Sequence, residues 1–140
     1  MKKRLTKKYL DELTYEVIGA AIEVHKALGP GLLESVYHVC MKHELDLREI
    51  NYKSEVFIPI CFKGMNMDID LKFDLFIEDC LAVELKAVNS FIPINEAQLL
   101  SYMKLLQSPK GVLINFNCLN IFRDGQKTFV NEFYRSLPDV

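Results

Sequence analysis

The sequence predicts one α/β domain built around a mixed β-sheet. Apolar residues recur at helical spacing up to residue 47, and runs rich in branched and aromatic residues follow from residue 54. A later strand, helix and strand in succession indicate a crossover between parallel strands. With 140 residues, of which 50% are apolar, the chain is the size of a single domain and can bury a core.

Two helices are expected at the start of the domain. Apolar residues at helical spacing predict the first over residues 10–28, and it should end at residues 29–31 (Gly-Pro-Gly), where glycine caps a helix and proline cannot continue one. A second apolar stripe predicts a helix over residues 32–47. Glu34 lies in its first turn, where the helix dipole favours a negative charge whatever the function.

Three strands are expected next, over residues 54–62, 67–77 and 81–88, because apolar side chains alternate there with a period of two. Pro59 cannot donate to a ladder, so the first strand should lie at an edge of the sheet. Residues 78–80 (Glu-Asp-Cys) should form the short loop of a β-hairpin between the other two.

The last part of the domain should contain a helix over residues 94–106 and a buried strand over 111–116 that runs parallel to the strand at 81–88. Residues 121–130 contain the turn dipeptide Asp-Gly and predict a C-terminal hairpin. The buried side of the helix is expected to carry Ala97, Leu100, Met103 and Leu106.

Charge and composition argue against several classes of protein. The net charge of −2 is not that of a tight nucleic-acid binder, although five of the 17 basic residues lie in the first eight positions. We expect residues 1–9 to be a flexible basic segment, 10–135 the domain and 136–140 a tail. Without a membrane-length apolar run or a secretory core, a cytoplasmic location is expected, and four cysteines without a C-x-x-C pair argue against a zinc or iron–sulfur site.

The acidic hairpin is the strongest candidate for chemistry. If its loop has three residues, Asp74 lies directly opposite Glu84, and Lys86 shares the face of Glu84. Two carboxylates and an ammonium group on one face suit a hard divalent cation, with the lysine near a phosphate or an activated water. The alternative is a solvated face with an ordinary surface ion pair, and a slip of one residue would separate the two carboxylates.

The order α-β-β-β-α-β, with Asp74 on the second strand and E-L-K at residues 84–86 on the third, resembles the PD-(D/E)XK nuclease superfamily, whose fold is called restriction-endonuclease-like. Residues 98–102 (Q-L-L-S-Y) are similar to the Q-x-x-x-Y motif of RecB-like exonuclease modules. Residues 31–37 (G-L-L-E-S-V-Y) match the motif that names the GxxExxY protein family. The resemblance covers about residues 10–130, and it implies an α-β-β-β-α-β core with an extra N-terminal helix and a C-terminal hairpin.

This resemblance implies a metal site. Asp74 and Glu84 would ligate Mg²⁺ or Mn²⁺, the backbone carbonyl of Leu85 would be a third ligand, and Glu34 would supply a further carboxylate. Lys86 would orient or activate the attacking water and stabilise charge on the phosphate.

The resemblance also assigns roles on the helix after the core strands. Gln98 and Tyr102 would position the substrate or the lysine. Asn95 is a departure, because members of the family often carry a histidine there.

Three functions follow as expectations. The first is a divalent-metal-dependent nuclease acting on DNA or RNA, and the second is a catalytically inactive nuclease-fold module that binds nucleic acid or a protein partner. The third is a metal enzyme with another substrate that uses His25, His38 or His43. A homodimer through the last helix or hairpin is compatible with each of them.

Overall fold

The fold is described by a computed structural model, over residues 4–140 of the chain. Its helices and strands are, in chain order, α1 (Lys7–Leu28), α2 (Glu34–Leu47), β1 (Tyr52–Phe62), β2 (Met65–Ile77), β3 (Leu81–Lys86), α3 (Pro93–Leu106), β4 (Lys110–Asn115), α4 (Ile121–Asp124), β5 (Gln126–Val130) and α5 (Glu132–Arg135). The strands form one sheet in the order β1-β2-β3-β4-β5, in which β3 and β4 are parallel and the other neighbours antiparallel. The predicted α/β class with a mixed central sheet is confirmed.

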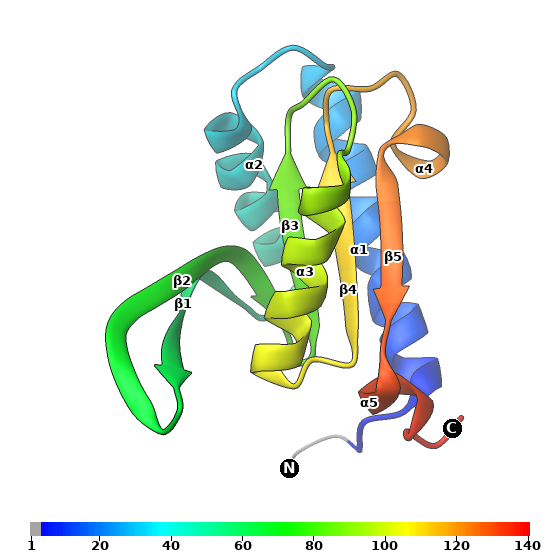
Figure 1. The fold of residues 1–140 in the computed structure, drawn as a ribbon. Coiled ribbons are helices and arrows are strands. Elements are labelled where there is room, and N and C mark those ends of the chain that lie inside the picture. The colour runs from blue at the N-terminus through cyan, green and yellow to red at the C-terminus, as the bar shows by residue number, and fades with distance from the viewer. Residues whose placement is uncertain (1–3) are drawn as a thin grey trace.

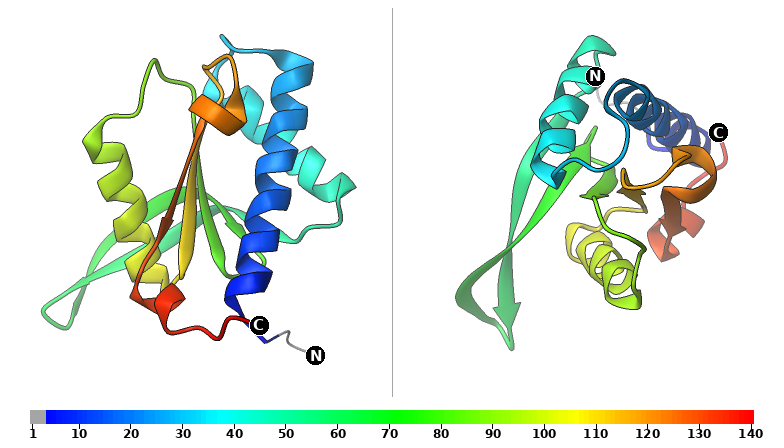
Figure 2. Two further views of the ribbon diagram at one scale, coloured as in Figure 1. Left: turned by 90° about the vertical axis from the view of Figure 1, so that its right-hand side faces the viewer. Right: turned by 90° about the horizontal axis from the view of Figure 1, so that it is seen from above.

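Helices cover both faces of this sheet (Figures 1 and 2). The apolar side chains of β3 at odd positions pack with α1 and α2, while Ala82, at an even position, packs with α3. The side chain of Glu84 is also at an even position, so it belongs to the face of β3 that carries α3. No helix over residues 4–140 has the length and apolar character needed to cross a membrane.

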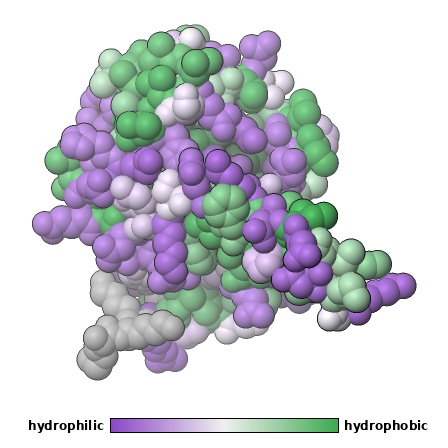
Figure 3. All heavy atoms as spheres, turned by 90° about the vertical axis from the view of Figure 1, so that its left-hand side faces the viewer, coloured by the Kyte–Doolittle hydropathy of each residue, from purple (hydrophilic) through white to green (hydrophobic). Residues whose placement is uncertain are grey.

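The hairpin between β2 and β3 has the predicted loop, since β2 ends at Ile77 and β3 begins at Leu81. These two residues pair with each other, and the pairing of β2 with β3 continues to Leu75 and Val83. Asp74 is the first residue of β2 beyond these pairs. Beyond it, β2 follows β1 into a long ribbon that projects from the body of the domain (Figure 1). Figure 3 shows this ribbon at the lower right, with both apolar and polar side chains exposed.

The predicted C-terminal hairpin is wrong. Residues 121–124 form the helical turn α4, because the side chain of Asn120 accepts a hydrogen bond from the backbone N–H of Arg123 and caps the turn. The Asp-Gly dipeptide ends this helix, and β5 pairs with β4 across the whole edge of the sheet. A buried strand such as β4 needs a hydrogen-bonding partner on each side. Pairing of β5 with β4 is therefore favoured over the hairpin that the Asp-Gly turn dipeptide predicts.

The predicted boundaries at the two termini also need correction. Helix α1 begins at Lys7, because the side chain of Thr6 caps it, so residues 7–9 are helical and not part of a flexible segment. The backbone N–H groups of Lys7 and Lys8 donate to the carbonyls of Pro138 and Asp139, which fastens the predicted tail to this helix. Residues 1–3 of the basic segment lie outside the described part of the chain.

The buried side of α3 differs from the prediction at two positions. Leu99 and Met103 are buried, whereas Leu100 and Ala97 are exposed. The reason lies on β4, where Gly111 has no side chain and a Cβ there would lie 2.6 Å from the sulfur of Met103. The helix therefore turns its 99–103 ridge onto this glycine, so the tertiary contact decides which apolar residues of the helix are covered.

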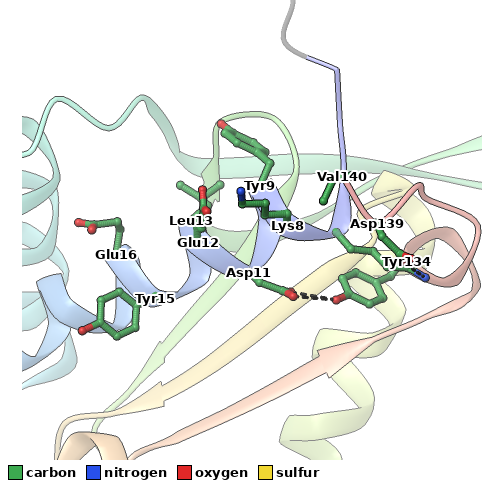
Figure 4. Close-up of a pocket in the computed structure, with 11 residues that line it drawn as sticks. Lys8, Tyr9, Asp11, Glu12, Leu13, Tyr15, Glu16, Tyr134, Asp139 and Val140 are labelled. Atoms are coloured by element: carbon green, nitrogen blue, oxygen red, sulfur yellow. Dashed lines mark hydrogen bonds and ion pairs between the residues drawn. The ribbon is translucent and has the colours of Figure 1, made fainter.

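The start of α1 and the C-terminal tail enclose a shallow cavity of about 950 Å³ (Figure 4). At its edge the carboxylate of Asp11 accepts hydrogen bonds from Lys110 Nζ at 2.7 Å and from the Tyr134 hydroxyl at 2.9 Å. Burial acts to raise the pKa of the Asp11 carboxyl, but these two hydrogen bonds lower it below its ordinary value. Lys110 is 7% exposed, so its ammonium group depends on this carboxylate.

We predict that Asp11→Ala lowers the free energy of unfolding by about 1–3 kcal/mol, because a nearly buried ammonium group loses its partner. Urea denaturation at pH 7 measures the change. Asp139→Ala is the matched control, since the Asp139 side chain is 87% exposed and its ion pair with Lys7 should contribute little. Equal stability losses in the two variants would contradict the assignment.

Candidate active site

The site lies where β2 parts from β3. At Asp74, side chains replace the backbone hydrogen bonds of the ladder: the Asp74 N–H donates to Glu84 Oε1 at 2.8 Å, and the Leu85 N–H donates to Asp74 Oδ2 at 2.7 Å. Each carboxylate therefore has one oxygen held by the backbone of the opposite strand. The other oxygen of each accepts no hydrogen bond from the described residues.

These two free oxygens each face a side chain that can carry positive charge. Glu84 Oε2 lies 4.0 Å from Lys86 Nζ, and Asp74 Oδ1 lies 3.9 Å from His38 Nδ1. Both separations exceed a hydrogen bond, so neither oxygen is saturated by its neighbour. Glu84 is 8% exposed, and the Asp74 side chain 18%, so solvent reaches the pair only in part.

Burial and mutual repulsion perturb the acidic groups. Burial, and then the Asp74 carboxylate, raise the pKa of Glu84 to about 7, against the stabilising effects of the Asp74 N–H and of Lys86. The pKa of Glu34 is also raised, first by partial burial and then by Asp74. Three carboxyl groups from α2, β2 and β3 thus share one electrostatic environment, and Lys86 favours the charged form of two of them.

Glu34 is brought to this environment by the loop before α2. The ring of Tyr37 stacks on Phe116 with centroids 4.4 Å apart, and its hydroxyl donates to the carbonyl of Gly29 at 2.6 Å and accepts from the N–H of Leu32 at 3.2 Å. These contacts hold the chain where α2 begins, so Glu34 stands in the first turn at the exposed rim of the site. The tyrosine of the G-x-x-E-x-x-Y motif therefore has a structural role.

Helix α3 contributes one of its two predicted residues. The ring of Tyr102 packs on Phe73 with centroids 5.8 Å apart. Burial, and then the charges of Glu84 and Asp74, raise the pKa of Tyr102. Gln98, one turn earlier, is exposed and forms no hydrogen bond with a described residue.

Asn95 has a local structural role at the start of α3. Its side-chain oxygen accepts a hydrogen bond from the N–H of Ile92 at 3.1 Å, which helps to cap the helix. This residue takes the place where the resemblance suggests a histidine, and capping accounts for an asparagine there.

His38 belongs to the site, although the sequence connected it only with a different metal enzyme. It lies one turn after Glu34 on α2, and that spacing of four was the available signal. His25 instead contacts the Cys118 carbonyl at 2.8 Å, and His43 is exposed.

The donor set fits a hard divalent cation. Within residues 4–140 no three His, Cys, Asp or Glu side chains already surround one point. However, two carboxylates each offer a free oxygen, and the carbonyl of Leu85 points to the same side of β3 as its N–H, toward Asp74. Mg²⁺ and similar ions commonly take one or two carboxylates and keep several waters, so a complete protein cage is not required.

We predict that Glu84→Gln stabilises the metal-free protein at pH 8 by up to about 3 kcal/mol, because it removes a buried charge. The pKa of Glu84 is about 7 in the folded state, against an ordinary value of 4.5. Between these two pH values the folded state therefore keeps a proton on Glu84 that the unfolded state has lost. Stability should therefore fall as pH rises through this window, and the variant should lose its advantage below about pH 4.5.

Urea denaturation in EDTA at several pH values measures this difference. Glu12→Gln, at an exposed position of α1, is the control. A wild-type protein as stable as Glu84→Gln at pH 8 would show that burial does not disfavour this carboxylate.

The comparison with protein-family models matches the part of the chain that contains the candidate site. The family model described as the PD-(D/E)XK nuclease superfamily matches residues 11–129, a range that contains every predicted site residue. Comparison with curated proteins and with solved structures gives no match. The narrower resemblance to the GxxExxY family stays a prediction. Because the match spans most of the 140 residues and the fold agrees, the chain belongs to the PD-(D/E)XK nuclease superfamily.

Proposed function

We propose that this protein is a divalent-metal-dependent nuclease that hydrolyses phosphodiester bonds in DNA or RNA. The observation that carries the proposal is the Asp74–Glu84 pair, in which each carboxylate has one oxygen fixed by a backbone N–H and the other free. Two orienting hydrogen bonds prepare the free oxygens to bind one cation, and the superfamily in which this pair occurs is one of nucleases.

The proposed ligands of Mg²⁺ or Mn²⁺ are Asp74, Glu84 and the backbone carbonyl of Leu85, with Glu34 as a further carboxylate at the rim. The raised pKa of Glu84 supports this assignment, because a buried carboxylate beside another one is stabilised by a bound cation. When bound, the cation would supply Lewis-acid stabilisation of the phosphate charge and a lower pKa for water.

Substrate binding should depend on the cation. The site carries three acidic groups against the single ammonium of Lys86, and the chain as a whole has a net charge of −2. A phosphodiester approaching the empty carboxylates would be repelled, because like charges a few ångströms apart interact strongly where solvent is partly excluded. The protein should therefore bind nucleic acid weakly in EDTA.

Lys86 is the proposed positioning group for the reaction. Its Nζ lies beside the free oxygen of Glu84, where an ammonium group can donate to a water molecule or to a phosphate oxygen. In hydrolysis the water oxygen forms a bond to phosphorus, the bond from phosphorus to the sugar oxygen breaks, and that oxygen acquires a proton. Tyr102 and Gln98 on α3 are proposed to position the substrate or the lysine.

The test is Mn²⁺-dependent cleavage of labelled single-stranded DNA, duplex DNA and RNA. We expect Asp74→Asn, Glu84→Gln and Lys86→Met to lower cleavage by about 10²-fold or more, since removal of one electrostatic group from such a site has an effect of that size. Lys104→Met is the control, because Lys104 is an exposed residue of α3. Cleavage that persists in EDTA or in all three site variants would contradict the proposal.

Metal binding separates the two principal functions. Calorimetry with Mn²⁺ should show binding that is lost in Glu84→Ala but kept in Lys86→Met. The Lys86→Met variant would then bind the metal without cleaving nucleic acid. If nucleic acid binds without turnover, and this binding is unchanged in Lys86→Met, the inactive nuclease-fold module is the correct description.

A further inference from the structure

We propose that the outer part of the ribbon formed by β1 and β2 is the surface through which two copies of this chain form a dimer. We call residues 59–70, which include the turn between the two strands, the ribbon tip. The inference goes beyond the proposed function and does not depend on it, because no residue of the ribbon tip belongs to the candidate active site.

The ribbon tip lies outside the packed body of the domain. Ile58 of β1 is 6% exposed and belongs to the apolar cluster that contains Leu99 and Met103 of α3. Every residue from 59 to 70 is exposed except Ile60, which is partly buried. Figures 1 and 2 show the ribbon extending away from the rest of the sheet and from the helices. A two-stranded hairpin is only marginally stable alone in water, so this segment is stabilised by any surface on which it can pack.

The ribbon tip is rich in large apolar side chains. Phe62, Met65, Met67 and Ile69 are between 42% and 66% exposed, and they lie within eight consecutive residues. Single exposed apolar side chains are ordinary, but a group of them marks an interaction surface. Aromatic residues and methionine are also enriched at protein interfaces relative to the rest of the surface.

Strand alternation places part of this group on one face of the ribbon. Ile58, Ile60 and Phe62 occupy alternate positions of β1, so Ile60 and Phe62 share the face on which Ile58 packs with α3. The shift in pairing register within the ribbon adds residues to β2 and leaves the alternation of β1 intact. Phe62 pairs with Met65, which extends the same face onto β2. The apolar face of the sheet therefore continues beyond the part of it that α3 covers.

The contact between two copies should be made by side chains and not by the strand edges. β1 lies at the edge of the sheet, but Pro59 has no N–H to donate, and the pairing register changes beside it. Proline and irregular pairing are features that prevent one edge strand from pairing with another. A face-to-face contact of two ribbon tips closes as a dimer, whereas edge pairing would extend the sheet.

The charges of the ribbon tip favour a second copy as the partner. Nearer the body, Lys72 pairs with Glu55 at 3.6 Å within the ribbon. The charged side chains of the tip are Lys63, Asp68 and Asp70, and none of them forms an ion pair with any residue in the described range 4–140. A twofold axis brings the same surface of both copies together, so the ammonium group of one tip can meet the carboxylates of the other.

Nucleic acid fits this surface less well than a second copy does. One lysine and two aspartates give the tip a net charge of −1, and an excess of carboxylates repels a polyanion. Lys63 Nζ lies 5.4 Å from the centroid of the Phe62 ring, so the charge and the apolar contact occur at the same place. A partner must therefore offer apolar side chains together with both signs of charge, and a second ribbon tip offers all three.

The mass of the protein in solution tests the dimer. Sedimentation velocity of the full chain at concentrations up to about 100 µM should show a species with twice the mass of one chain. Phe62→Asp should weaken dimerisation at least about tenfold, because it places a charge in the centre of the apolar contact. Phe122→Asp is the matched control, since Phe122 is 64% exposed and lies on α4, outside the ribbon. A monomeric wild type, or equal dimerisation of the two variants, would overturn the proposal.

An exchange of charges tests whether the partner is a second ribbon tip. Lys63→Glu makes the tip uniformly acidic, and the combined substitutions Asp68→Lys and Asp70→Lys make it uniformly basic. Each variant should dimerise more weakly than the wild type, and an equimolar mixture of the two should recover association, because unlike charges then face each other. A mixture that associates no better than its components would contradict a self-complementary contact.

Hydrogen exchange locates the contact on the chain. Amide exchange in residues 59–70 should slow as the protein concentration rises, and Phe62→Asp should remove this dependence. Concentration-dependent protection of residues 126–135 instead would place the dimer at the C-terminal elements and refute the ribbon contact. If the wild type is monomeric and Lys63→Glu weakens its binding to single-stranded DNA, the tip contacts nucleic acid and the proposal is wrong.

Discussion

The separation of β2 from β3 at Asp74 is the constraint on which the site depends. Beyond this residue the ladder ends, and two carboxylates accept the N–H groups that strand pairing would otherwise satisfy. Buried backbone donors require acceptors, so the fold itself holds Asp74 and Glu84 in place. The same hydrogen bonds leave one oxygen of each carboxylate free. The backbone donors that the sheet must satisfy therefore also position a candidate pair of metal ligands.

This arrangement places acidic groups where they weaken the metal-free protein. The pKa of Glu84, raised to about 7, shows that its charge is unfavourable in the folded state. Lys86 stabilises this charge only from 4.0 Å, and Asp74 and Glu34 oppose it. A sheet centre optimised for stability alone would not contain this cluster, whereas the cation proposed above would compensate its charge.

Elements set by local periodicity were predictable. The three-residue loop after Ile77 and the pairing that follows from it were correct, because side-chain alternation leaves few registers that bury the apolar face. Predictions based on local signals failed where a distant partner decides. The Asp-Gly dipeptide ends α4 because β4 pairs with β5, and Leu99 is buried because Gly111 admits it.

The sequence by itself determined the fold class, the acidic hairpin and the residues that the superfamily pattern identifies, from Asp74 to Lys86. Only the tertiary structure decided which other side chains meet them. His38 and Ser54 are 16 residues apart on a helix and an edge strand, yet they hydrogen-bond at 3.0 Å beside Asp74. The physical reason is that periodicity specifies which side of its own element a residue occupies, whereas packing between elements selects its neighbours.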